Sequence, residues 1–272
     1  MKNMIYMLPM TNKSIGNSFI VTTEDGKVIV IDGGWRSDTD NLISRLKDIT
    51  GEKTPHINGW LLSHAHDDHI CAFMGLIERR MGDVIIDKVY YCFPSTDYCM
   101  RCEPHDGHTV REFYSLLPKF AGIAQIVNQG DSFDIGAAHF DVLYSHDPAV
   151  THKDINNSTT VFRMTLGSKS VMWLGDLGVA GGEKLLACSG EKLKSDIVQM
   201  AHHGQNGVDR PVYEAIAPKI CLWPTPQWLW DNDAGKGYNT HDWKTIIVQG
   251  WMKEIGAGEW YIAKDGEQAI EL

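Results

Sequence analysis

The chain has 272 residues, a length that suits one large layered domain, and we expect a single domain over residues 1–272. Its 25 basic and 35 acidic side chains give a formal charge of -10, which repels polyanions and argues against nucleic acid as a partner. No stretch approaches the roughly 20 apolar residues of a membrane helix, no secretion signal is evident, and the six cysteines are too few for a disulfide framework. We therefore expect a cytoplasmic protein that does not bind membranes.

The first half of the chain alternates apolar strand patterns with helical periodicity. Residues 24–26 form a turn between two strands and predict a hairpin, and Pro118 is expected to break a later helix. The predicted strands lie at 19–23, 28–32, 57–63 and 84–92, and the predicted helices at 38–49, 70–77 and 110–120.

The second half repeats this alternation without an internal sequence repeat. Strands are predicted at 123–128, 131–135, 139–145, 159–166, 170–176, 196–201, 219–224, 259–263 and 268–272, the last two as a pair, and helices at 183–188, 209–217 and from about 241. Strand meanders with helices after each indicate an α/β fold, with two sheets packed face to face and helices outside.

A dense cluster of metal-binding residue types follows the strand at 57–63. In an extended chain, His64 and His66 point the same way and can reach one metal ion. Asp68 and His69, where the chain turns into a helix, can face a second ion. Imidazole and carboxylate are ligands that zinc, manganese and iron accept.

This histidine motif resembles the metal-binding signature of the metallo-β-lactamase superfamily. Other family motifs lie in the expected order over roughly residues 16–223: Ile31-Asp32-Gly33-Gly34 before the histidine motif, and Gly175-Asp176 and Ala201-His202-His203-Gly204 after it. The resemblance implies a four-layer αββα sandwich with two mixed β-sheets. It also implies two divalent metal ions, with zinc expected first and manganese or iron as alternatives.

The resemblance also assigns roles to individual residues. Asp176 would bridge the two ions, and Asp32 would orient a ligating histidine by accepting its hydrogen bond. His202 directly follows the predicted strand and is expected to bind the second metal, with His203 either supporting a ligand or facing the substrate, although the reverse assignment stays open. The predicted metal ligands are His64, His66, Asp68, His69, Asp176 and His202.

One family feature is missing, since no further ligand histidine precedes Asp176 in a His-Thr-Pro-Gly-like segment. The segment 156–158, Asn-Asn-Ser, together with His-His-Gly resembles the branch that includes ComEC-type DNA-uptake proteins and phosphorylcholine esterases. His146 or His152 could supply the absent ligand. In the same branch, the segment ending at His241 would bring a proton donor to the leaving group, whereas the alternative is an exposed histidine beside a helix cap.

Two further groups admit a structural or a functional interpretation. Cys99, Cys102, His105 and His108 could form a small zinc site, but a loop along one wall of the active-site cleft is favoured. The tryptophans at 223, 228 and 230 could line another wall or pack in the core.

These features predict a dinuclear metal-dependent hydrolase. A hydroxide held between the ions would attack an ester, with a phosphodiester favoured because two metals stabilise both the attacking and the leaving oxygen. Asp68 and His241 are the predicted catalytic residues. The substrate is expected to be a small-molecule or cell-envelope-derived ester, and the oligomeric state stays open.

Three alternatives remain. The first is hydrolysis of a carboxylic centre such as a lactone, thioester or β-lactam, which is disfavoured because such enzymes usually carry the missing histidine. The second is a di-iron redox protein, which is disfavoured because the motif lacks a glutamate. The third is metal binding without turnover.

Overall fold

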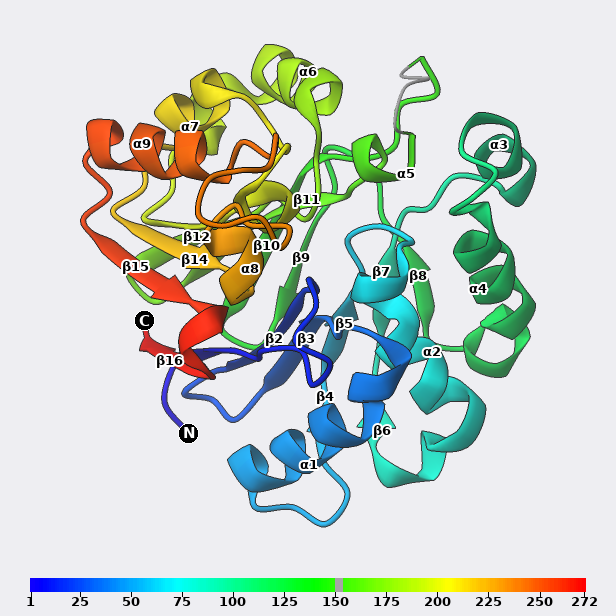
Figure 1. The fold of residues 1–272 in the computed structure, drawn as a ribbon. Coiled ribbons are helices and arrows are strands. Elements are labelled where there is room, and N and C mark those ends of the chain that lie inside the picture. Colours follow the sequence, from blue (N-terminus) through cyan, green and yellow to red (C-terminus); the bar gives the residue numbers. More distant parts are fainter. Residues whose placement is uncertain (150–153) are drawn as a thin grey trace.

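The chain folds into two seven-stranded sheets that pack face to face, with helices on both outer faces (Figure 1). The computed structural model describes residues 1–149 and 154–272. This arrangement confirms the predicted four-layer α/β sandwich.

The first sheet has the strand order β16-β1-β2-β3-β5-β7-β8. The strands β2 and β3 form the predicted hairpin, and β3, β5, β7 and β8 run parallel to one another. The bounds are β1 Met4–Met7, β2 Ser18–Thr22, β3 Val28–Asp32, β5 Gly59–Leu61, β7 Val89–Tyr91, β8 Ala124–Ile126 and β16 Gln268–Glu271. A short parallel pair, β4 His56–Ile57 and β6 Ile85–Ile86, lies apart from this sheet.

The second sheet has the order β15-β14-β13-β12-β11-β10-β9. The strands β9 to β12 form an antiparallel meander, and β12 to β15 are parallel, so both sheets are mixed. The bounds are β9 Ser132–Ile135, β10 Ala138–Tyr144, β11 Val161–Leu166, β12 Lys169–Trp173, β13 Ile197–Gln199, β14 Ile220–Trp223 and β15 Glu259–Ile262. The carboxyl ends of β12, β13 and β14 therefore meet at one edge.

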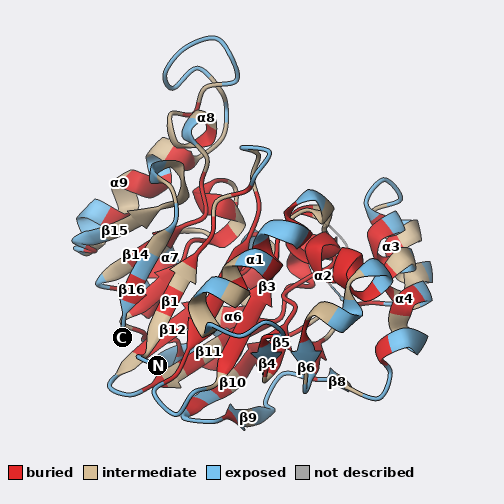
Figure 2. Cartoon of the chain, turned by 90° about the horizontal axis from the view of Figure 1, so that it is seen from below, coloured by how far each residue is buried: buried red, intermediate tan, exposed pale blue. Residues whose placement is uncertain are grey.

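Apolar side chains fill three successive layers of core. Between the sheets, Phe19 of the first sheet meets Trp173 of the second edge to face, with ring centroids 4.9 Å apart. The helices α1 and α2 cover the first sheet, and α6, α7 and α9 cover the second, each with its buried face inward (Figure 2). The helices are α1 Thr39–Thr50, α2 Asp67–Arg79, α3 Thr96–Cys102, α4 Gly107–Phe120, α5 Asp154–Asn157, α6 Val179–Ser189, α7 Arg210–Ile216, α8 Gln227–Trp230 and α9 Thr245–Ile255.

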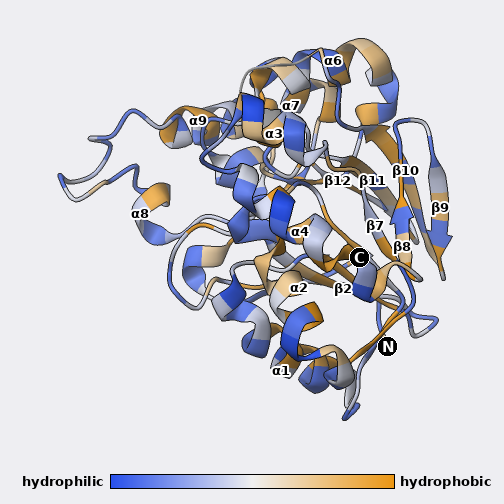
Figure 3. Cartoon of the chain, turned by 90° about the vertical axis from the view of Figure 1, so that its right-hand side faces the viewer, coloured by the Kyte–Doolittle hydropathy of each residue, from blue (hydrophilic) through white to orange (hydrophobic). Residues whose placement is uncertain are grey.

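Hydropathy follows the layers, since the inner strands are mainly hydrophobic and the helices carry mixed faces (Figure 3). The segment between α8 and α9 projects from the body of the molecule and is largely hydrophilic (Figures 2 and 3). In the part of the chain that the structure describes, no helix combines the length and apolar character needed to cross a bilayer.

The prediction that the last two strands of the chain pair with each other was wrong. The strand β15 joins the second sheet beside β14, whereas β16 joins the first sheet beside β1. Between them a 3-10 turn and Gly266, with φ 98°, redirect the chain. The C-terminal segment thus crosses from one sheet to the other.

Other differences are local. Pro118 does not break α4 at its own position, since the helix continues through it and ends two residues later at Phe120. The predicted strand 84–92 is divided into β6 and β7. The helix α3 and the strand β1 were not predicted from the sequence.

Candidate metal centre

Seven metal-capable side chains gather at the edge where strands of both sheets end. The loop after β5 carries His64 and His66, and the first turn of α2 carries Asp68 and His69. Asp176 follows β12, and His202 and His203 follow β13. The topology of two parallel-strand edges therefore brings residues more than 100 positions apart to one place.

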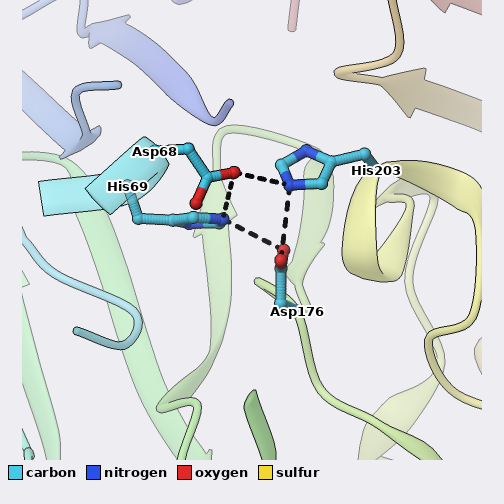
Figure 4. A group of neighbouring side chains, drawn as sticks. All are labelled: Asp68, His69, Asp176 and His203. Carbon is cyan, nitrogen blue, oxygen red and sulfur yellow. Dashed lines mark ion pairs between the residues drawn. The ribbon is translucent and has the colours of Figure 1, made fainter. Parts of the chain in front are cut away.

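Four of these side chains form the first group: Asp68, His69, Asp176 and His203 (Figure 4). The His203 Nε2 atom lies 3.0 Å from Asp68 Oδ2 and 3.3 Å from Asp176 Oδ2. The His69 Nε2 atom lies 3.1 Å from Asp176 Oδ1. One potential ligand atom from each residue lies within 4.8 Å of the others, a spacing compatible with one shared ion.

The second group comprises His64, His66 and again Asp176. The His64 Nε2 atom lies 3.2 Å from His66 Nδ1 and 3.9 Å from Asp176 Oδ2. Because Asp176 belongs to both groups, its two carboxylate oxygens are placed to serve two neighbouring ions.

The residues present fit bound metal ions. Five buried ligand atoms in residues 1–149 and 154–272 make no well-formed hydrogen bond: His66 Nε2, Asp68 Oδ2, His69 Nε2, Asp176 Oδ1 and His203 Nε2. Four of them contact one another as ion pairs, Asp68 Oδ2 with His203 Nε2 at 3.0 Å and Asp176 Oδ1 with His69 Nε2 at 3.1 Å. A buried polar atom whose hydrogen bonding is not satisfied costs about 1–3 kcal/mol. Metal coordination would satisfy them together, and imidazole with carboxylate is a donor set that divalent transition metals accept.

The charges of the groups also favour cations. Burial would raise the pKa of Asp176, but His203, His69 and His202 outweigh it and hold that pKa well below its usual value. Burial lowers the pKa of His64 well below its usual value, so this imidazole is neutral and ready to bind metal. Burial also opposes charge on His69, yet Asp176, Asp68 and Asp32 hold its pKa well above the ordinary value.

Asp32 fixes the orientation of His69. Its Oδ2 atom lies 2.7 Å from His69 Nδ1 and also accepts from the side chains of Asn17 and Ser63, while Oδ1 accepts from the Ser63 backbone at 2.7 Å. With Nδ1 donating to this carboxylate, His69 Nε2 is left to face the site. Asp32 is fully buried and has φ 57°, a left-handed conformation that Asp and Asn tolerate better than most residues.

Gly175 and Gln199 position Asp176. Gly175 has φ 49°, and a Cβ atom there would lie 2.7 Å from Thr159 Cγ2 and 3.0 Å from Ser63 Cβ. The Gln199 side chain accepts from Gly175 N at 2.7 Å and donates to Gly175 O at 3.2 Å. The turn before Asp176 is thereby clamped against β13.

A left-handed turn decides which histidine after β13 enters the first group. His202 and His203 have φ 50° and 55°, a conformation that costs roughly 1–2 kcal/mol per residue. The His202 N–H donates to Gly175 O at 2.9 Å, and Thr225 Oγ1 donates to His203 O at 2.6 Å. This turn directs His203 into the cluster.

His202, the residue predicted as a ligand, takes another position. Its Nδ1 atom lies 3.3 Å from Asn206 O, and its Nε2 atom lies 3.8 Å from Asp176 Oδ2, outside both groups. Burial lowers its pKa, and the side chain is 17% exposed. The strand ends at Gln199, so the two histidines belong to a turn and do not extend the strand.

Other predicted residues lie apart from these groups. The His146 ring packs edge to face on Tyr98 at 4.8 Å, and His152 falls outside the described residues. Cys99 is buried within α3, and His108 lies 3.3 Å from Asp67 through Nε2. Among the described residues, the two metal groups include none of the four side chains of the Cys99–His108 motif.

His241 lies in the projecting segment between α8 and α9. Its ring stacks on Trp243 at a centroid distance of 3.6 Å, and its Nδ1 atom lies 2.8 Å from Asp242 Oδ1. Of the three tryptophans considered as cleft walls, Trp223 is fully buried in the core, whereas Trp228 and Trp230 are partly exposed.

Sequence reasoning missed the supporting residues Asn17, Ser63 and Gln199. Ser63 directly precedes the histidine motif, and this position was its only sequence signal. Asn17 directly precedes β2 and Gln199 ends β13, without a sequence signal of their own, and only the fold brings them beside Asp32 and Gly175.

The comparisons with known proteins agree with this fold. The family model described as the metallo-beta-lactamase superfamily matches residues 11–218. The structure of YhfI, a metallo-beta-lactamase fold protein from Bacillus subtilis, is similar over 98% of this chain and 99% of its own, with 14% identity and a TM-score of 0.55. CmlA, a diiron beta-hydroxylase from Streptomyces venezuelae, is similar over 100% of this chain and 54% of its own, with 13% identity and a TM-score of 0.56. A search of curated proteins returned no match.

Proposed function

The chain belongs to the metallo-beta-lactamase superfamily, and from this premise we propose that it is a dinuclear metal-dependent hydrolase of a phosphodiester or related ester. The observation that carries the proposal is the position of Asp176, which is shared by two groups of closely spaced ligand atoms, several of which make no well-formed hydrogen bond in the described chain. A carboxylate shared in this way reduces the repulsion between two cations.

The proposed ligands follow the two groups. Asp68, His69, Asp176 and His203 would hold one ion, and His64, His66 and Asp176 the other. When bound, the ions would supply a hydroxide nucleophile near neutral pH and stabilise charge on the attacking and leaving oxygens. The three-residue group leaves coordination positions for a substrate.

The chain's own residues prepare this chemistry. Asp32 holds the tautomer of His69, and the clamp on Gly175 keeps the Asp176 carboxylate between the groups. His241 is proposed to give a proton to the leaving oxygen, with Asp242 orienting its ring through Nδ1. Asp68 keeps its role of holding metal charge, 3.0 Å from His203.

The two neighbouring groups of metal ligands favour phosphodiesters over carboxylic esters as substrates. Two cations suit in-line displacement at phosphorus, because both the attacking and the leaving oxygen gain charge. The small-molecule or cell-envelope-derived class remains the proposed substrate, since the formal charge of -10 disfavours extended nucleic acid.

The test compares ester classes on one metal-loaded preparation. We expect turnover of bis-p-nitrophenyl phosphate to exceed that of p-nitrophenyl butyrate, and to be lost in Asp176→Asn. Asp134→Asn, an exposed carboxylate on β9, is the control and should retain activity. Faster butyrate turnover would favour a carboxylic substrate. Retained iron with oxygen uptake and no ester turnover would favour a hydroxylase, the class to which CmlA belongs.

A further inference from the structure

A large cavity lies between two segments that flank the metal centre. Its volume is about 710 Å³, within the range of about 300–1,000 Å³ that small-molecule sites occupy. One wall comes from residues 8–16, which follow β1 of the first sheet, and the other from residues 224–233, which follow β14 of the second. The cavity therefore spans both sheets, as the metal centre does.

Both walls are joined to ligand-bearing residues. Asn17, next to the wall residue Gly16, donates its backbone N–H to Asp68 O at 3.0 Å. Thr225, between the wall residues Pro224 and Pro226, donates to His203 O at 2.6 Å. Each wall is therefore one residue away from a hydrogen bond to the backbone of a ligand in the first metal group, although no ligand side chain in the described part of the chain itself lines the cavity.

The walls are also connected to each other and held firmly. Trp228 Nε1 of one wall donates to Lys13 O of the other at 3.2 Å. Thr11 donates through its backbone and hydroxyl to the buried carboxylate of Asp38 at 2.8 and 2.6 Å. A group entering this space would meet a preformed surface, which lowers the entropy cost of binding.

The chemistry of the lining is mainly apolar. Leu8, Met10, Pro224, Pro226 and Trp228 supply its hydrophobic surface. Of its four charged residues, three have partners: Asp233 Oδ1 accepts three backbone N–H groups, Asp231 accepts from Gln227 at 2.6 Å, and Lys264 pairs with Asp265 at 2.6 Å, whereas Lys13 is exposed. The cavity is therefore suited to an uncharged apolar or aromatic group.

An aromatic row leads from the cavity to the proposed proton donor. Trp228 contacts Trp243 at a centroid distance of 5.2 Å, and Trp243 stacks on His241 at 3.6 Å. A substrate group lying on Trp228 would thus lie at the end of the row that holds His241.

We propose that this cavity binds the aromatic or bulky apolar substituent of the substrate ester, and that Trp228 is the residue that selects it. The inference rests on the proposed function for the identity of the ester, but not for the existence of the subsite. The substrate class becomes a phosphate ester with one aryl or similarly large apolar group.

The first test measures binding without turnover. Calorimetry on the metal-loaded protein compares phenylphosphonate with methylphosphonate, which share the anionic group and differ in the apolar one. We expect phenylphosphonate to bind about tenfold more tightly, the size of one good aromatic contact. Trp228→Ala should remove this preference while metal content stays the same, and Trp228→Phe should restore much of it.

Two further variants distinguish loss of the subsite from a general loss of folding. Ser14→Phe fills the cavity from its partly buried lining without removing a contact, and should also abolish the preference. Trp251→Ala, on α9, removes a partly buried tryptophan outside the cavity and should leave the preference intact. Equal binding of the two phosphonates by the wild type would overturn the subsite, as would an unchanged preference in Trp228→Ala and Ser14→Phe.

The second test measures turnover. We expect Trp228→Ala to raise KM for both bis-p-nitrophenyl phosphate and methyl p-nitrophenyl phosphate, because each carries an aryl group for the subsite, and Trp251→Ala to leave both KM values at the wild-type value. A phenylphosphonate preference without turnover of either diester would refute the proposed phosphodiesterase activity while supporting the subsite. Turnover of both diesters without a preference for phenylphosphonate would support the phosphodiesterase activity and refute the subsite.

Discussion

Replacement of Asp32 by Asn tests how the fold prepares the metal centre. The substitution keeps the shape of the side chain and suits φ 57°, so it changes mainly charge and hydrogen bonding. The carboxylate accepts bonds from His69 Nδ1, Asn17 Nδ2, Ser63 N and Ser63 Oγ at 2.7 to 2.8 Å. An amide cannot accept all four, because its nitrogen is itself a donor.

The magnitude follows from this arrangement. The introduced amide can be oriented with its nitrogen in place of either carboxylate oxygen. Fewest hydrogen bonds are lost when the nitrogen replaces Oδ1, because that oxygen accepts only from the Ser63 N–H, which is then left unsatisfied. One unsatisfied buried donor costs about 1–3 kcal/mol of unfolding free energy. His69 also loses its anionic partner, and loss of such a partner lowers metal affinity roughly 10–100-fold.

Asp38→Asn is the matched control. Asp38 is a buried carboxylate that accepts from Thr11 N, Thr11 Oγ1 and Trp35 N, and these donors lie outside the two metal groups. Urea unfolding of the metal-free proteins should show a loss of stability in both variants. Competition with a chelator should show weaker metal binding in Asp32→Asn alone. Wild-type metal affinity in Asp32→Asn would refute the role assigned to Asp32.

Three further predictions concern the ligands and their turns. His203→Gln should lose one ion per chain in metal analysis, whereas His202→Gln should retain two; the opposite pattern would assign His202 as the ligand. Gly175→Ala should destabilise the fold by about 1–3 kcal/mol in urea, because its Cβ would lie 2.7 Å from Thr159; unchanged stability would contradict the close packing. Burial opposes charge on His203, but Asp176 and Asp68 raise its pKa to about 9, so metal must displace a proton below that pH. Metal affinity should rise about tenfold per pH unit for each displaced proton and then level off. A flat titration from pH 6 to 9 would refute the proton's presence.

The raised pKa of His203 contributes one component of the pH dependence of the metal-free fold. The unfolded histidine loses its proton near pH ~6.5, whereas folded His203 keeps it to about pH 9. The stabilisation from this proton is therefore complete below the lower value and lost as pH rises through the higher one. Urea unfolding at several pH values checks this direction.

The sequence predicted the layers because hydrophobic periodicity marks most of the longer strands and helices. It could not place β15 and β16 in different sheets, because pairing partners are non-local and the two strands have similar patterns. The short strand β1 was missed since its four residues precede any turn signal that would mark a strand. Pro118 was expected to break a helix because sequence alone does not show that the helix ends two residues later.

The residues of the candidate site also fall into those that the sequence predicts and those that only the fold reveals. The loop carrying His64 to His69 was predictable because local spacing alone brings its side chains together. The choice between His202 and His203 depends on two left-handed residues, held by Gly175 and Thr225 from elsewhere in the fold. Such long-range contacts leave no local signal, and the same holds for Gln199.

Metal content measured together with phosphodiester turnover tests the central claim most directly. After supplementation with zinc, manganese or iron and removal of excess metal, the wild-type chain should retain two ions and hydrolyse bis-p-nitrophenyl phosphate. Asp176→Asn, which alters the residue shared by both groups, should lose metal and turnover together. A wild-type protein that retains no metal after supplementation would contradict the dinuclear centre.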